Sequence, residues 1–214
     1  SANADDGVRV YLNGKKIIDA WDVNNFELRQ EIVNLDSGKH EIVVEYKENT
    51  WTAFLTFDYK RLAQVPNVTQ KDVAYNWGNE SPVVNGPVDN FTALFDQSGS
   101  YDAGDYFIQT FADDGVKVNV NGSNLIDRIS KYTGTADRAL WLGVNKGEHS
   151  VSTLYYEGGY SAGIFSHVVP LNTWLAYYYP TKDPSGLPKA AKVIQPIGAH
   201  NKLYEEHEGS PVSG

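Results

Sequence analysis

The chain has 214 residues, 41% of them hydrophobic and 13% aromatic, enough for one large domain or one and a half medium ones. Its formal net charge is -9 and it shows no basic stripe, which argues against nucleic acid as a partner. It has no cysteine, hence neither disulfides nor thiolate zinc sites, and no apolar run near the roughly 20 residues that would insert into a membrane.

The first predicted strands follow an acidic turn at the start of the chain. Residues 5–14 read Asp-Asp-Gly-Val-Arg-Val-Tyr-Leu-Asn-Gly, with Val8, Val10 and Leu12 at every second position, as in a strand with one buried face. The Asn-Gly that follows is typical of a hairpin, because both central residues of a type I′ turn need positive φ. We therefore predict strands at 8–12, 16–19, 39–46 and 53–59.

A near copy of this pattern lies about 108 residues further along. Residues 63–90, with several Pro, Gly and Asn, are predicted as a linker and the entry to the second copy. Two strands are then predicted at 90–95 and 105–111, before a second acidic turn. Residues 113–122 read Asp-Asp-Gly-Val-Lys-Val-Asn-Val-Asn-Gly, and the match continues past the turn. A repeat of this length is a whole domain.

The strand pattern predicts an all-β chain. No segment shows a convincing 3.6-residue apolar stripe, so we expect antiparallel β-sandwich or barrel modules in a tandem repeat. We expect a truncated first module at 1–65, a full second module at 66–180 and an extended C-terminal connector at 181–214. The first module lacks the two opening strands of the second. Its open edge should be completed by the C-terminal tail or by another chain, which would cause self-association.

Several motifs of the second copy resemble the protective-antigen-type β-barrel domain, which bacterial toxins, adhesins, glycosidases and yeast flocculins share. The matching motifs are Gly86-Pro87-Val88-Asp89-Asn90-Phe91, Gly104-Asp105-Tyr106-Phe107, the run 113–122, Leu125-Ile126-Asp127, Gly147-Glu148-His149 and Tyr155-Tyr156-Glu157-Gly158-Gly159. The resemblance covers about 75–170 and, as a truncated copy, about 4–60. It implies carbohydrate binding by a secreted or cell-surface protein.

The resemblance also implies a calcium site. In the lectin members, two adjacent aspartates joined by a cis peptide hold a calcium ion that takes two sugar hydroxyls, which suits a cation that prefers oxygen ligands. By resemblance, these positions are Asp113 and Asp114, and in the first copy Asp5 and Asp6. The later loop of the lectin site corresponds to Glu157–Tyr160 and to Glu48–Trp51, where only the first copy has an asparagine, Asn49.

The residues alone leave a second interpretation of the acidic turns open. Aspartate before glycine also stabilises a tight turn through bonds from its side chain to the backbone. Trp51 and Tyr160, on the loops beside the two turns, are the preferred ligand-contacting aromatic residues, because exposed rings stack on sugars. His40 and His149 open equivalent strands and are expected to pack at a strand edge or to stabilise turns, whereas Trp77 and Trp141 are expected in the core.

The predicted function is therefore non-catalytic binding of a glycan or cell-wall polysaccharide. We expect the chain to belong to a secreted or cell-surface multidomain protein, such as an adhesin or a cell-wall enzyme. No catalytic set of residues can be assembled from motif spacing, so we do not expect an enzyme. The alternative is a structural or protein-interaction spacer that has the fold without a ligand.

Overall fold

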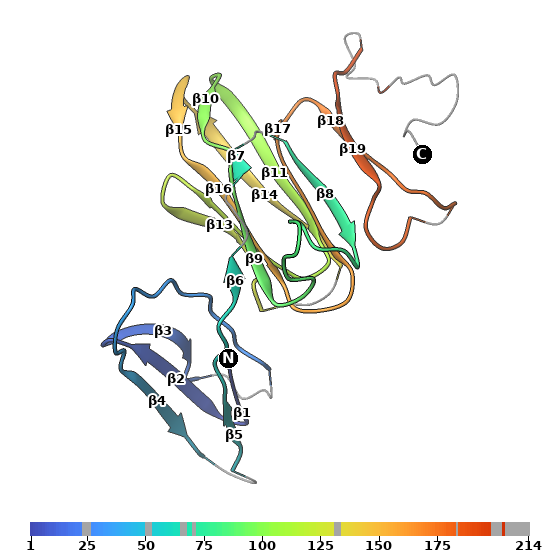
Figure 1. The fold of residues 1–214 in the computed structure, drawn as a ribbon. Coiled ribbons are helices and arrows are strands. Elements are labelled where there is room, and N and C mark those ends of the chain that lie inside the picture. Colours follow the sequence, from blue (N-terminus) through green and yellow to red (C-terminus); the bar gives the residue numbers. More distant parts are fainter. Residues whose placement is uncertain are drawn as a thin grey trace. The chain divides into compact units, whose positions relative to one another are not determined.

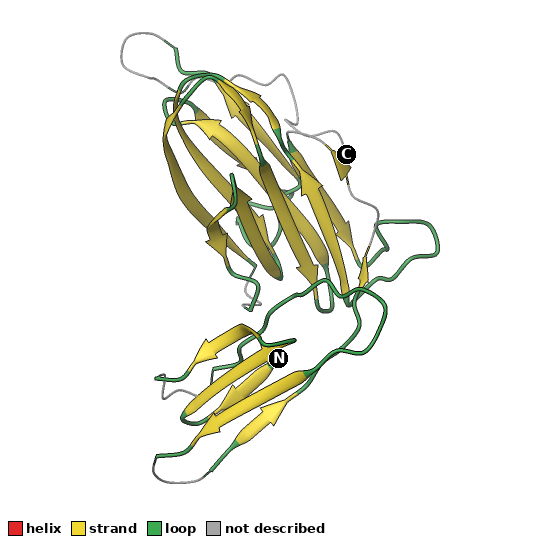
Figure 2. Cartoon of the chain, turned by 90° about the vertical axis from the view of Figure 1, so that its left-hand side faces the viewer, coloured by secondary structure: helices red, strands yellow, loops and turns green. Residues whose placement is uncertain are grey.

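The computed structural model of the chain describes residues 1–22, 27–49, 53–64, 68–69, 72–130, 134–182, 184–197 and 203. Two compact units can be distinguished, unit 1 (Ser1–Arg61) and unit 2 (Leu62–Gly214), and each is described by itself. The described residues form strands, turns and loops and no helix, so the all-β prediction is confirmed (Figures 1 and 2). Among these residues there is accordingly no helix that could cross a membrane.

Unit 1 contains five strands in two small antiparallel sheets. Three of them form a sheet in the order β3-β2-β4, and the other two pair with each other. Their bounds are β1 (Ala2–Ala4), β2 (Gly7–Leu12), β3 (Lys15–Ala20), β4 (Ile42–Lys47) and β5 (Leu55–Phe57). Alternation along β1, β2 and β3 directs small and branched apolar side chains into one core, made of Ala2, Ala4, Val8, Val10, Ile18 and Ala20.

Two larger sheets form the body of unit 2. The first has the order β13-β12-β16-β9-β6, with β7 also on β9, and the second has the order β14-β11-β17-β8. The strands of the first sheet are β6 (Ala63–Gln64), β7 (Val68–Thr69), β9 (Phe91–Asp96), β12 (Gly115–Val120), β13 (Ser123–Asp127) and β16 (Val151–Glu157). Those of the second are β8 (Val73–Gly78), β11 (Gly104–Ala112), β14 (Thr135–Val144) and β17 (Ala162–Pro170).

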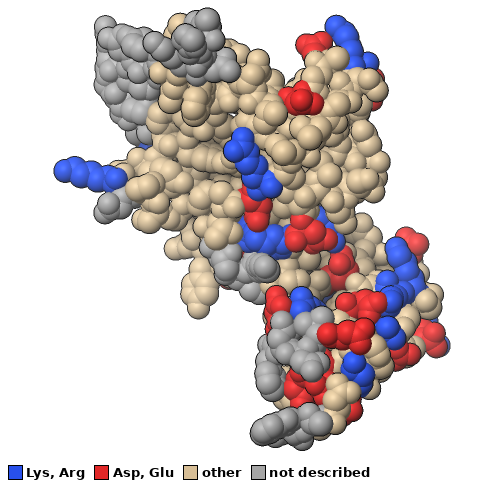
Figure 3. All heavy atoms as spheres, turned by 180° about the vertical axis from the view of Figure 1, so that it is seen from behind, with Lys and Arg blue, Asp and Glu red and all other residues tan. Residues whose placement is uncertain are grey.

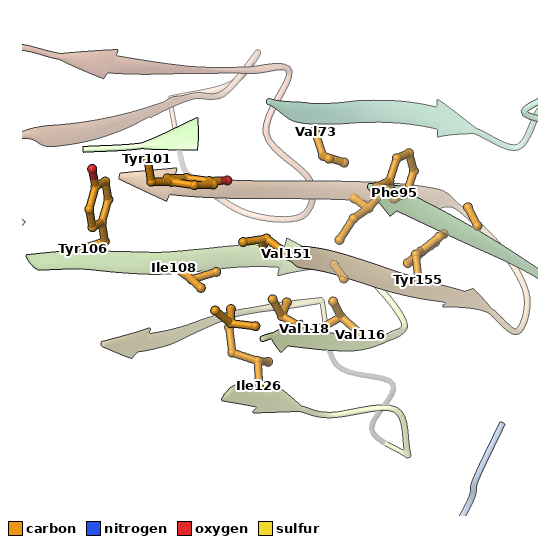
Figure 4. Packing of buried hydrophobic residues seen from close by; sticks show 14 of the residues in the cluster. Val73, Phe95, Tyr101, Tyr106, Ile108, Val116, Val118, Ile126, Val151 and Tyr155 are labelled. Atoms are coloured by element: carbon orange, nitrogen blue, oxygen red, sulfur yellow. The ribbon is translucent and has the colours of Figure 1, made fainter. Parts of the chain in front are cut away.

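Both sheets of unit 2 contribute side chains to a single core. Figure 4 shows Phe95, Val116, Val118 and Tyr155 from the first sheet and Ile108 from the second among these buried residues. Two of the tryptophans expected in the core, Trp77 and Trp141, pack against this cluster, as predicted. A short pair, β10 (Gly99–Tyr101) and β15 (Gly147–His149), adds Tyr101 to the same core.

The C-terminal segment of unit 2 forms a hairpin that the sequence did not predict. Strand β18 (Trp174–Tyr178) pairs with β19 (Ala190–Ile194), which lies inside the stretch expected as an extended connector. The ring of Tyr177 packs against Phe111, Phe165 and His167, on strands of the second sheet. The tail strand is therefore part of unit 2. The expectation that the tail or another chain completes unit 1 stays a prediction.

Unit 1 keeps an open edge. Strand β16 of unit 2 lies between β12 and β9, whereas β4, which pairs with β2 in the same way, has no second neighbour among the described strands. Ile42 and Val43 of β4 are exposed.

On the face shown in Figure 3, acidic and basic side chains are interspersed over unit 1, whereas uncharged residues make up most of the surface of unit 2.

Candidate functional site

The acidic turn of unit 2 joins β11 to β12 and is bonded to the loop between β16 and β17. One carboxylate oxygen of Asp113, Oδ1, accepts hydrogen bonds from the Tyr155 hydroxyl at 2.7 Å and from the Gly163 amide at 3.1 Å. The Oδ2 atom of Asp114 accepts from the amides of Gly158 at 2.6 Å and Gly159 at 3.3 Å. The prediction that these two loops adjoin is confirmed.

Glu157 is enclosed in the same group of side chains. Its side chain is completely buried, its Oε1 atom accepts a hydrogen bond from the Gly159 amide at 2.7 Å, and its Oε2 atom contacts the Tyr155 hydroxyl. Burial, together with the charges of Asp113 and Asp114, raises the pKa of Glu157 to about 8. Burial also raises the pKa of Asp113. We call Asp113, Asp114, Tyr155 and Glu157 the acidic clamp.

The protonation of Glu157 follows from the number of protons in the acidic clamp. A tyrosine hydroxyl carries one proton and can donate it to only one carboxyl group at a time. Tyr155 lies within hydrogen-bond distance of both Asp113 and Glu157. Ionisation of both would leave one carboxylate without a donor at this hydroxyl, in a buried position. At neutral pH the clamp is therefore best satisfied with Glu157 protonated.

The glycine of the Asp-Asp-Gly motif is explained by a close backbone approach. A Cβ atom on Gly115 would lie 2.6 Å from the carbonyl oxygen of Ile129, and one on Gly7 would lie 2.4 Å from the carbonyl oxygen of Trp21. Any side chain at these positions would push the first residues of β12 or β2 away from the segment that passes beside them. The motif thus contains a packing requirement in addition to its carboxylates.

Unit 1 repeats the bonding pattern of the acidic clamp in a more open setting. The Oδ1 atom of Asp5 accepts from the Tyr46 hydroxyl at 2.8 Å and from the Phe54 amide at 3.2 Å, and Asp6 Oδ2 accepts from the Asn49 amide at 2.5 Å. Partial burial opposes ionisation of Asp5, but the hydrogen bonds from Tyr46 and from backbone amides outweigh it and lower the pKa of Asp5.

The two acidic turns differ in their access to solvent. Glu48, which contacts the Tyr46 hydroxyl at 2.5 Å, is exposed, whereas the equivalent Glu157 is buried. Asn49 is exposed as well, and Trp51 lies outside the described residues. The described peptide bonds are all trans, which includes Asp5–Asp6 and Asp113–Asp114 and differs from the cis bond of the lectin members.

Tyr160 stands out on the loop that the acidic clamp anchors. Its side chain is 94% exposed, and its backbone has a φ of 76°, in the left-handed region that non-glycine residues rarely occupy. Backbone strain of this kind persists only where the surrounding structure holds it, and it is concentrated at functional positions. The Asp114 side chain, through Gly158 and Gly159, fixes the residues that precede this exposed ring.

Arg128 supports the acidic turn of unit 2 from the inside and was not predicted as a site residue. This buried guanidinium donates to the carbonyl oxygens of Asp114 at 2.8 Å and Ala112 at 3.1 Å, and it pairs with Asp137 at 2.5 Å. A buried cation thus fixes the backbone of the turn that carries the two carboxylates. The only signal in the sequence is an arginine directly after Leu125-Ile126-Asp127, which does not distinguish a buried residue from a surface one.

His40 and His149 stabilise turns, as predicted. His149 Nδ1 lies 3.0 Å from Asn121 Nδ2, and the Oδ1 atom of Asn121 accepts from the Ser150 amide at 2.9 Å. In unit 1, His40 Nδ1 lies 2.9 Å from Asn13 Nδ2, and the Glu41 amide donates to Asn13 Oδ1 at 2.9 Å. Each histidine therefore holds the asparagine of an Asn-Gly turn.

We expect Asn121→Ala to destabilise unit 2 by about 2 kcal/mol. The substitution removes the bonds to Ser150 and His149, and it places alanine at a φ of 49°, which costs about 1 kcal/mol relative to asparagine. Urea unfolding monitored through hydrogen exchange of β12 and β16 measures the effect. Asn119→Ala, two residues earlier in β12 and bonded only locally, is the control; equal losses for the two variants would contradict this role of Asn121.

Comparison with known proteins assigns a family to part of the chain. No curated protein matches it. Two similar solved structures are of anti-sigma factor domain-containing proteins. One, from Clostridium clariflavum, is 21% identical with a TM-score of 0.41, and the other is 17% identical with a TM-score of 0.37. Each match covers 79% of this chain and 76% of the other. The PA14 domain family model matches residues 1–66, the part of the chain that the motif resemblance covers as a truncated copy.

Proposed function

We propose that this chain is a non-catalytic carbohydrate-binding module of a secreted or cell-surface multidomain protein, with two copies of one module. The PA14 match at residues 1–66 supports a carbohydrate-binding or interaction role. The observation that carries the proposal is Tyr160, an exposed ring on a strained loop anchored by the acidic turn. An exposed aromatic ring on a loop that is bonded to the carboxylates of the acidic turn suits a sugar, which presents an apolar ring face and hydroxyl edges.

The carboxylates of the acidic turns support a calcium ion as a second ligand. Asp113, Asp5 and Asp6 each hold the neighbouring loop through one carboxylate oxygen, whereas the Asp114 carboxylate, which holds its loop through Oδ2, also interacts with the Glu157 side chain. Calcium takes six to eight oxygen ligands, so two carboxylates need backbone, water or sugar oxygens as well. No group of three acidic, histidine or cysteine side chains in the described part of the chain is arranged around a metal position. The acidic turn of unit 1, beside the exposed Asn49, is more open to solvent than that of unit 2.

Substitution by asparagine separates ligand binding from turn stability. In Asp6→Asn and Asp114→Asn the amide oxygen can still accept the backbone bonds, but the charge that attracts calcium is lost. We expect millimolar calcium to raise the melting temperature of the unaltered protein and of Asp36→Asn, an exposed control, but to have a smaller effect on each turn variant. A glycan array with calcium and with chelator then tests the proposed function itself.

One specific observation favours the alternative, a spacer without a ligand. Both acidic turns hold a neighbouring loop through backbone amides, a role that needs no sugar or metal. In that case calcium would leave all melting temperatures unchanged, no glycan would bind, and Asp114→Ala would destabilise unit 2 by about 1 kcal/mol or more through the lost amide bonds.

A further inference from the structure

A second candidate site lies in unit 2 on the outer face of the sheet β14-β11-β17-β8. A groove of about 300 Å³ is lined by side chains from β11, β14, the segment after β17 and the start of β18. We call it the outer-sheet groove, and its residues are Phe107, Gln109, Arg138, Leu171, Asn172, Thr173, Trp174 and Leu175. The acidic clamp contributes none of them.

The strand register places the groove residues on the face away from the core. Ile108 points into the core, so Phe107 and Gln109, its neighbours along β11, point to the opposite face. Arg138 is paired with Gln109 and Leu140 with Phe107, and paired residues share a face, so β14 adds a cation and an exposed leucine to this side.

Arg138 gives the groove its charge. Its guanidinium carbon lies 4.0 Å from the centroid of the Phe107 ring, a stacking arrangement that holds the planar group in place. Within the described residues Arg138 makes no ion pair, and no acidic side chain lines the groove. The nearest acidic residue along β11, Asp105, is occupied by a hydrogen bond from the Gly143 amide at 2.8 Å. An unpaired, oriented cation on a chain of net charge -9 is suited to an anionic ligand.

The other groove residues indicate which kind of anion. Trp174 is 45% exposed, so part of its ring is available to an apolar ring face. Asn172 is exposed and can bond hydroxyl groups, whereas Thr173 already donates to the Pro170 carbonyl oxygen at 2.8 Å. A single cation beside an aromatic ring is too little for a polyphosphate backbone, which requires several cations. A guanidinium does match one carboxylate, through two parallel hydrogen bonds.

We propose that the outer-sheet groove binds a carboxylate-bearing sugar residue of a glycan, whose carboxylate pairs with Arg138 and whose ring stacks on Trp174. The proposal rests on the proposed function, because it assumes that the chain binds carbohydrate, and it adds both a second place on unit 2 and a class of sugar. It requires no calcium and no residue of the acidic clamp.

Calorimetric titration of the full chain with oligosaccharides of glucuronic acid tests this proposal. The matched ligand is the carboxyl-reduced oligosaccharide, in which each carboxylate has become a hydroxymethyl group. We expect the acidic ligand to bind at least about tenfold more tightly, and Arg138→Gln to remove that preference. Arg138→Lys should restore part of it, because lysine keeps the charge without the fork of donors. Trp174→Ala should lower the affinity for both ligands, and Trp174→Tyr should lower it less.

Lys146→Gln is the control, because Lys146 is another exposed cation of unit 2 and its partner is Asp102. Melting curves of each variant confirm that it is folded. If the acidic ligand binds but Arg138→Gln and Trp174→Ala leave its affinity unchanged, the groove is not the site and the proposal is wrong, while the proposed function stands. If the unaltered protein bound the acidic and the carboxyl-reduced ligand with equal affinity, the proposal that the groove recognises a carboxylate-bearing sugar would be wrong. If no glycan binds to the unaltered protein on the array or by titration, both proposals fail.

Discussion

Tyr155→Phe is expected to destabilise unit 2 by about 3 kcal/mol, because it removes the hydroxyl at the centre of the acidic clamp. That hydroxyl bonds Asp113 at 2.7 Å, contacts Glu157 and accepts from the Gly163 amide at 3.1 Å. Phenylalanine keeps the ring and its packing but leaves two buried carboxyl groups with one partner fewer. The melting temperature of unit 2 should fall by about 6–12 °C, given about 2–4 °C for each kcal/mol in a unit of this size.

The same substitution in unit 1 provides a matched control. Tyr46 bonds Asp5 at 2.8 Å and contacts Glu48, but this position is open to solvent, so water can replace the lost hydroxyl. We expect Tyr46→Phe to cost about 1 kcal/mol or less. Hydrogen exchange of the amides in β16 and β4 assigns each effect to its own unit. If Tyr155→Phe cost no more than Tyr46→Phe, burial of the acidic clamp would have no energetic consequence.

The strand pattern of the chain could be predicted because it depends on local features. Alternation at Val116, Val118 and Val120 and the Asn-Gly turn after it fix two strands and their hairpin. The similarity of the two acidic turns predicted that each lies beside the loop that follows β16 or β4, and the hydrogen bonds to Gly158 and Asn49 agree. Local periodicity and repetition were sufficient for these elements.

The partner of the tail strand could not be predicted. Val193 and Ile194 gave a weak strand signal, but the identity of the neighbouring strand depends on which sheet face remains to be covered. The outer face of unit 2 carries Phe111 and Phe165, which Tyr177 covers, and this face is defined only once the sheet has formed. Long-range pairing of this kind leaves no periodic trace in either segment.

The burial of Glu157 could not be predicted from the sequence either. Glu48 and Glu157 occupy equivalent positions after the strands β4 and β16, yet one is exposed and the other is buried. The difference arises from the surroundings of each loop, because β16 has β9 beside it and β4 has no described strand there. A residue's environment thus depends on strands that are distant in the sequence, and so does its pKa.

The raised pKa of Glu157 makes the stability of unit 2 depend on pH. The folded-state pKa is about 8 and the ordinary value is 4.5, so between these pH values the folded chain holds a proton that the unfolded chain has released. The free energy of unfolding therefore falls as pH rises from about 4.5 to about 8, and the contribution of Glu157 to this fall is at most about 5 kcal/mol. Below pH 4.5 both states are protonated and this contribution no longer changes.

Glu157→Gln should abolish this contribution, because glutamine is a neutral analogue of the protonated side chain. Its amide oxygen can still accept from the Gly159 amide, and its amide group can donate to the carboxylate of Asp114. We expect the variant to match the unaltered protein near pH 5 and to be more stable near pH 8.5, by at most about 5 kcal/mol. Urea unfolding across this range, read from the amides of β16, measures the difference between the two profiles. Glu48→Gln, at the exposed equivalent position, should leave the profile of unit 2 unchanged. Parallel profiles for Glu157→Gln and the unaltered protein would mean that Glu157 is ionised in the folded clamp across this pH range and does not cause the pH dependence.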